Sequence, residues 1–138
     1  MTLLQIHAAA VCAWFGLIAA EAVLELREHE PAERRLIASI HAWIDILIEV
    51  PLIALVLVTG AMLLARAWPA PPLLMLKVGA GLIAVVANLI CVVLVRARVK
   101  ATDDACVSKL TRQIRFTGLA TPFGLAAMII GFGFLAPH

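Results

Sequence analysis

The sequence predicts an all-α integral membrane protein, an up-down four-helix bundle in one domain over residues 1–138, with both termini on the outer side of the membrane. Two observations concern composition. Hydrophobic residues make up 64% of the chain and charged residues 14%, and the mean hydropathy is +1.05. Soluble domains are far more polar than this. The third observation is that the apolar residues gather in four stretches, each long enough for the ~20 residues of a membrane-spanning helix.

The four predicted helices are separated by short polar or proline-rich segments. The predicted spans are Leu3–Leu26, Leu36–Ala65, Pro72–Val95 and Thr111–Leu135. Because short connections make consecutive helices antiparallel neighbours, an up-down bundle is the expected arrangement. The Thr121-Pro122 step predicts a bend in the fourth helix, because proline cannot donate a backbone hydrogen bond.

Basic residues predict the orientation of the bundle. They gather around the first and third connections, whereas Arg66 marks the opposite side and Lys77 lies just inside it. By the positive-inside rule, these two connections lie in the cytoplasm and both termini lie outside. In a bacterial inner membrane the outside is the periplasm. The basic residues on the cytoplasmic side are Arg27, Arg34, Arg35, Arg96, Arg98, Lys100, Lys109, Arg112 and Arg115.

Ionisable side chains within the spans point to a function. A charged residue at the centre of a membrane helix costs roughly 2.5–3.5 kcal/mol even on insertion scales, so such residues are usually functional. Glu21, Glu25 and His29 follow one another at intervals of four and therefore share a face of the first helix. The corresponding residues of the second helix, at the same spacing, are His41, Asp45 and Glu49.

In an antiparallel hairpin these two faces meet. We expect Glu21 opposite Glu49, Glu25 opposite Asp45, and His29 near His41. Carboxylate oxygens and imidazole nitrogens together suit iron, manganese, zinc or copper. The six residues therefore predict a transition-metal site between the first two helices. Two other interpretations remain open. In one, the six residues form ion pairs or a proton relay. In the other, the acidic side chains are solvated at the cytoplasmic interface.

A second group lies in the outer half. His7 is one turn inside the first helix, and Lys77 is one turn inside the third, at a similar depth. A buried histidine is a common axial ligand of haem iron, and a neutral lysine can act as a ligand or an acid. The alternative is structural, with Lys77 extending to the headgroups and His7 bonded to a neighbouring helix.

Several short motifs carry a family resemblance. His7, Trp14-Phe15, Glu33-Arg34-Arg35-Leu36, Thr59-Gly60 and Lys77 resemble the HemJ-type protoporphyrinogen oxidases and, more distantly, the membrane domain of CopD-type copper-resistance proteins. The resemblance covers the first three helices. It implies a small helical membrane protein that binds haem b through the positions of His7 and Lys77 and oxidises protoporphyrinogen IX.

Three functions follow from these features. The first is a membrane metalloprotein with a metal centre between the first two helices, and with a haem on the outer side as an additional expectation. The second is a haem b oxidoreductase of the HemJ kind. The third is a cation transporter or membrane-complex subunit, which at four helices predicts a homo-oligomer. The expected partners are the lipid bilayer and a metal ion or haem, and no motif predicts a nucleic-acid partner.

Overall fold

The computed structural model describes residues 1–26 and 30–133, and every regular element in these ranges is helical. The elements are α1 (Leu3–Leu26), α2 (Pro31–Ile44), the π-helical turn η1 (Asp45–Glu49), α3 (Val50–Arg66), α4 (Pro72–Lys100), α5 (Asp104–Thr117), the 3₁₀ turn η2 (Gly118–Ala120) and α6 (Thr121–Gly133).

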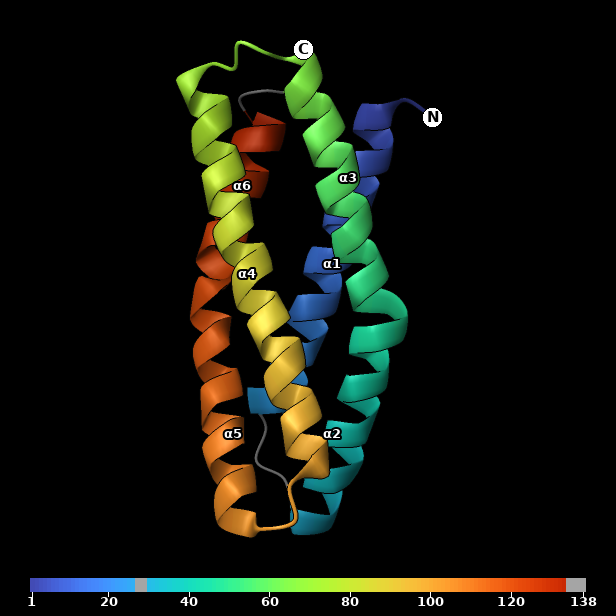
Figure 1. Cartoon of the computed structure of the whole chain (residues 1–138), viewed down its shortest axis with the longest axis vertical. Helices are drawn as coiled ribbons and strands as arrows, with labels where there is room; N and C mark the ends of the chain where they lie inside the picture. Colours follow the sequence, from blue (N-terminus) through green and yellow to red (C-terminus); the bar gives the residue numbers. More distant parts are fainter. Residues whose placement is uncertain (27–29, 134–138) are drawn as a thin grey trace.

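These elements form four long rods, because α2, η1 and α3 are continuous and so are α5, η2 and α6. Within residues 1–26 and 30–133, four helices are long and apolar enough to cross a membrane, which confirms this part of the prediction. Figure 1 shows consecutive rods running in opposite directions, so the start of α1 and the end of α6 lie at the same end. The four helices are Leu3–Leu26, Glu33–Arg66, Pro72–Lys100 and Asp104–Gly133.

The third connection is shorter than the sequence suggested. We expected a polar loop from Arg96 to about residue 110, but α4 continues to Lys100 and α5 begins at Asp104. The Asp103 side chain caps α5 by accepting a 3.0 Å hydrogen bond from the backbone N–H of Cys106. Such a cap satisfies a free donor at the helix start and allows a polar segment to be helical.

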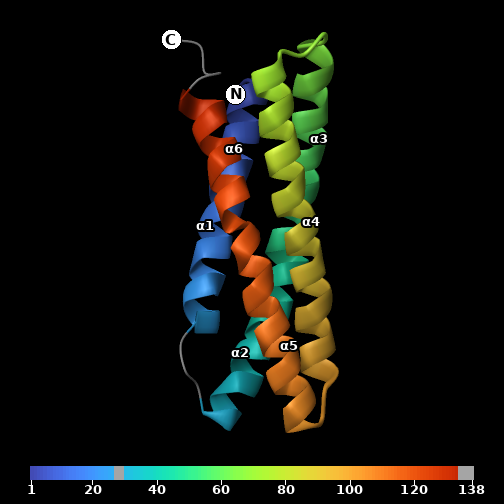
Figure 2. The ribbon, with the colours of Figure 1, turned by 90° about the vertical axis from the view of Figure 1, so that its left-hand side faces the viewer.

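Two of the rods contain an irregular turn beside a proline. The expected irregularity in the fourth rod is present as η2, after which α6 begins at Thr121-Pro122 (Figure 2). In the second rod, η1 lies directly before Val50-Pro51. Pro51 has no N–H to donate to the carbonyl four residues earlier, and its ring crowds that carbonyl. A widened turn at this place is one way of relieving both effects.

The distribution of side chains is the reverse of that in a soluble protein. Large apolar side chains such as Leu47, Val58 and Val93 are exposed on the outside, whereas six ionisable residues near the α2 end of the bundle are less than 10% exposed. The rods pack mainly as α1 on α3, α4 on α5 and α6, and α2 on α4. A small apolar layer in the middle consists of Ala10, Trp14, Ile53, Val56, Ala84 and Val85.

Candidate metal centre

The polar cluster lies where α1, α2, η1 and α4 come together, and we define it as Glu21, Glu25, His41, Asp45, Glu49 and Arg98. All six side chains are buried, with exposed fractions between 0% for Asp45 and 7% for Glu25. The interpretation of the acidic residues as a solvated interface therefore does not hold for these positions. Carboxylates at this depth need partners, because an unpaired buried charge is costly.

Glu25 is held by charged and hydrogen-bonding partners on two helices. Arg98 donates from Nη1 to Oε2 at 2.8 Å and from Nη2 to Oε1 at 2.5 Å, which is a bidentate pair. His41 Nδ1 lies 2.8 Å from the same Oε1. The interpretation as ion pairs therefore holds for Glu25. Arg98 was counted in the sequence only as one of the basic residues near the cytoplasm, so its position in the cluster was missed.

The bond to Glu25 also determines the role of His41. Arg98 keeps Glu25 ionised, and an ionised carboxylate can only accept, so His41 donates from Nδ1. In the neutral imidazole the lone pair is then on Nε2. That atom lies 3.6 Å from Glu21 Oε2 and 3.5 Å from Asp45 Oδ1. A histidine oriented by a carboxylate on its far nitrogen is the usual arrangement at protein metal sites.

Three ligand atoms surround one point in the cluster. One ligand atom each from Glu21, His41 and Asp45 lies within 4.8 Å of the other two. Nitrogen and oxygen ligands lie about 2.0–2.2 Å from a bound zinc ion, so two ligands of a tetrahedral site are roughly 3.4 Å apart. The observed separations of 3.5 and 3.6 Å are close to this value. We refer to Glu21, His41 and Asp45 as the metal triad.

Several oxygens of the cluster have no hydrogen-bond donor within residues 1–26 and 30–133. These are Glu21 Oε1, both oxygens of Asp45, and Glu49 Oε1. Arg98 balances the charge of Glu25, and Arg115 bonds the Glu25 backbone carbonyl instead of a carboxylate. Glu21, His41, Asp45 and Glu49 therefore share a small buried volume. A cation placed between them would satisfy both the charge and the lone pairs.

The π turn brings the second-rod residues onto one face. An α-helix turns by about 100° per residue, so residues four apart drift by about 40° around it. His41, Asp45, Glu49 and Ile53 are nevertheless all buried. The wider turn at Asp45–Glu49 offsets this drift. The four-residue spacing predicted the shared face, and Pro51 is the signal in the sequence for the turn that maintains it.

The pairing of the two helices differs from the expected one by about one turn. Glu25 lies opposite His41 and Glu21 lies near Asp45, whereas we expected Glu25 opposite Asp45 and Glu21 opposite Glu49. The cause is that α2 begins at Pro31, earlier than the expected Leu36, so the chain reverses closer to its N-terminus. His29, the sixth expected ligand, lies outside the described residues.

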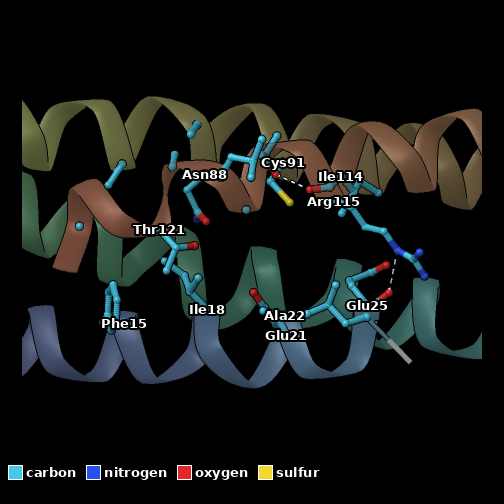
Figure 3. A pocket seen from close by; sticks show the side chains of 18 of the residues that line it. Phe15, Ile18, Glu21, Ala22, Glu25, Asn88, Cys91, Ile114, Arg115 and Thr121 are labelled. Atoms are coloured by element: carbon cyan, nitrogen blue, oxygen red, sulfur yellow. Dashed lines mark hydrogen bonds between the residues drawn. The ribbon is translucent and has the colours of Figure 1, made fainter. Parts of the chain in front are cut away.

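A cavity of about 300 Å³ adjoins the polar cluster on the side of α5 and η2. Its walls include Glu21 and His41 of the metal triad, and Asn88 and Cys91 of α4. Figure 3 shows Glu21 and Glu25 of α1 on one side of it, with Asn88, Cys91 and Arg115 on the other. An ion on the triad would therefore have space beside it for a further ligand.

The outer pair of candidate residues has a different environment. His7 is 9% exposed, and its Nδ1 lies 2.9 Å from Thr59 Oγ1 on α3. Lys77 is partly buried, and its aliphatic chain passes close to Gly131 of α6, where an added Cβ would lie 2.7 Å from Lys77 Cε. His7 is thus bonded to a neighbouring helix, as the structural interpretation predicted. The functional role of the two residues stays a prediction.

The bond to Thr59 nevertheless leaves His7 suited to act as a ligand. The single hydroxyl proton of Thr59 goes to the Leu55 carbonyl, 2.6 Å away, so Thr59 Oγ1 accepts from His7 Nδ1. The lone pair of the neutral imidazole is then on Nε2. Thr59 was part of a sequence motif, but its role in fixing the His7 tautomer was not foreseen.

Comparisons of the chain with family models, with curated proteins and with solved structures find no match.

Proposed function

We propose that the chain is an integral membrane metalloprotein that binds one transition-metal ion through Glu21, His41 and Asp45. The observation that carries the proposal is the convergence of three buried ligand atoms within 4.8 Å of one another. The carboxylate oxygens without donors among the described residues support it. One imidazole nitrogen with carboxylate oxygens favours iron, manganese or zinc over Cu(I).

Glu25 and Arg98 are assigned positioning roles in this proposal. Both Glu25 oxygens already accept strong hydrogen bonds, one of them from His41, so Glu25 orients the histidine instead of binding the ion. Such outer carboxylates fix the tautomer of the ligand and raise its basicity. Glu49, with Oε1 unbonded in the described part of the chain, is a candidate for a fourth ligand or for a proton carrier.

The proposal includes an orientation in the membrane. The exposed apolar surface of the four rods faces lipid, and the basic residues at the α2–α5 end face the cytoplasm. In a bacterial inner membrane both termini are then periplasmic. The metal triad lies in the cytoplasmic half of the bilayer.

Metal analysis of detergent-purified protein tests the proposal. Wild-type protein is expected to contain about one ion of iron, manganese or zinc per chain, and Asp45→Asn to retain less than about a tenth of that amount, because a charged ligand is lost. Asp104→Asn is the matched control, since Asp104 is exposed in the first turn of α5, and it should keep the full amount. Well-folded wild-type protein that takes up no metal would refute the proposal.

A second candidate function is a haem b oxidoreductase of the HemJ kind. The observation that favours it is the His7 tautomer, which directs a lone pair to Nε2. Protein expressed with ample haem should then be red and show a Soret band that disappears in His7→Ala and persists in His41→Ala. Colourless wild-type protein would contradict it.

A further inference from the structure

The cavity beside the polar cluster lies between two contacts that join α1 to the fourth rod. Towards the α2 end of the bundle, Arg115 Nε donates to the Glu25 carbonyl at 3.0 Å and joins α5 to the end of α1. Towards the other end, Gly124 of α6 lies so close to α1 that an added Cβ would be 3.2 Å from the Phe15 ring. Between these two contacts, α1 and η2 form opposite walls of the cavity.

The walls of the cavity are mostly apolar. Trp14, Phe15, Ile18, Ala22 and Ala84 contribute much of the lining. Glu21 and Asn88 point into the cavity from opposite helices in Figure 3. Within the described part of the chain, Glu21 Oε1 has no donor within hydrogen-bond distance, and Asn88 Nδ2, which lies towards Glu49, makes no regular hydrogen bond. Glu21 and Asn88 thus offer an unused acceptor and an unused donor within a largely hydrocarbon-like space.

We infer that this cavity binds a neutral, membrane-soluble alcohol, whose hydroxyl group lies between Glu21 and Asn88 and whose hydrocarbon body fills the rest. A hydroxyl donates one hydrogen bond and accepts others, so a single group satisfies both side chains. The neighbouring carboxylates of the polar cluster disfavour an anionic head. A volume of about 300 Å³ is at the small end of known ligand sites, so one short chain or ring fits and a whole phospholipid does not.

The inference does not depend on the metal ion. The atom of Glu21 that faces His41 is Oε2, and the atom assigned to the alcohol is Oε1. Asn88 and the apolar walls lie outside the metal triad. A protein without metal therefore still has the binding site, and failure of either proposal leaves the other open to its own test.

Quenching of Trp14 fluorescence by a brominated alcohol tests the inference. Trp14 lines the cavity and is 4% exposed, whereas Trp43 and Trp68 are exposed and are first replaced by phenylalanine. The probe is 8-bromooctan-1-ol, added to the protein in lipid nanodiscs. We expect saturable quenching that unlabelled octan-1-ol reverses. The matched probes 1-bromooctane and 8-bromooctanoate should bind about tenfold more weakly, because they lack the hydroxyl or carry a charge.

Variants of the cavity wall complete the test. Ala22→Phe fills the cavity from α1, and Ala120→Leu fills it from η2, so either one decides the matter if the other does not fold. Both should weaken binding of 8-bromooctan-1-ol by at least about tenfold, and Asn88→Leu by about tenfold. Val23→Phe is the matched control, because Val23 is 62% exposed and points away, and it should leave binding unchanged. Equal quenching by all three probes, or quenching that Ala22→Phe and Ala120→Leu leave unchanged, would overturn the inference.

Discussion

The two nitrogens of His41 have different surroundings, and this difference underlies the proposed site. Nδ1 bonds Glu25, which Arg98 holds in a bidentate pair, and Nε2 faces Glu21 and Asp45. The chain of contacts from α4 through α1 to α2 fixes the position of the imidazole. A ligand that is held in place before the ion arrives loses little conformational freedom on binding.

The Glu25–Arg98 pair gives a prediction on stability. Arg98→Met should lower the free energy of unfolding by about 3 to 5 kcal/mol, because it leaves the Glu25 carboxylate buried without its cation. The double variant Glu25→Gln with Arg98→Met should recover much of this loss, since no uncompensated charge remains. Reversible unfolding in mixed micelles measures both.

Arg96→Met serves as the control for this pair, since Arg96 is exposed on the same helix. It should change the free energy of unfolding by less than about 0.5 kcal/mol. If Arg98→Met were equally mild, the bidentate pair would not be a structural element of the bundle.

At the level of elements, the π turn and Pro51 together position the second-rod ligands. Pro51→Ala restores a backbone N–H that can bond the Leu47 carbonyl, which removes a cause of the turn. Asp45 should then rotate away from His41 Nε2, and affinity for the metal should fall at least about tenfold while the fold is retained. Competition with a chelator measures the affinity. Pro72→Ala, at the start of α4 where proline is well tolerated, should leave it unchanged.

The contact of α6 with α1 and α4 gives a second prediction on elements. At Gly124 an added Cβ would meet the Phe15 ring at 3.2 Å and the Ala84 Cβ at 3.4 Å, whereas at Gly79 nothing lies within 4 Å. Gly124→Ala should destabilise the protein by about 1 to 3 kcal/mol through overpacking. Gly79→Ala should be neutral or slightly stabilising, because alanine favours a helix. Thermal unfolding of the two variants checks the difference, and equal effects would contradict the close packing.

The sequence predicted the four long helices because hydrophobic length is a local property that needs no knowledge of packing. It predicted that Glu21, Asp45 and their neighbours share faces, because a spacing of four is also local. The pairing of those faces was wrong by about one turn, since it depends on where α2 begins. Arg98 was missed because a basic residue near a helix end normally faces solvent, and only the packing of α4 against α1 shows otherwise.

At the level of the whole molecule, the bundle contains two polar regions and an apolar layer between them. Ala10 and Trp14 separate His7 from Glu21 along α1, and Ile53 and Val56 separate Glu49 from Thr59 along the second rod. Both regions are therefore isolated from each other by packed hydrocarbon in this conformation. A transporter that works as a single chain needs a polar path through the bundle, and the apolar layer interrupts such a path. This arrangement therefore favours a binding protein over a transporter of that kind.

The proposed orientation is testable with Cys106, which is exposed near the start of α5. In a variant with Cys12 and Cys91 replaced by alanine, a membrane-impermeant maleimide should label Cys106 only after the cells are permeabilised. Adding Ala70→Cys in the second connection, with Cys106 also replaced, should give labelling of intact cells. The opposite labelling pattern would reverse the orientation and place the metal triad in the outer half.

The central claim is that a metal ion lies against Nε2 of His41. Pulsed electron paramagnetic resonance of Mn²⁺-loaded protein detects a nitrogen atom bound to the ion. Wild-type protein and His7→Gln should both show the coupling of one imidazole nitrogen, and His41→Gln should lose it. A bound Mn²⁺ ion without nitrogen coupling, or a coupling that persists in His41→Gln, would contradict the account.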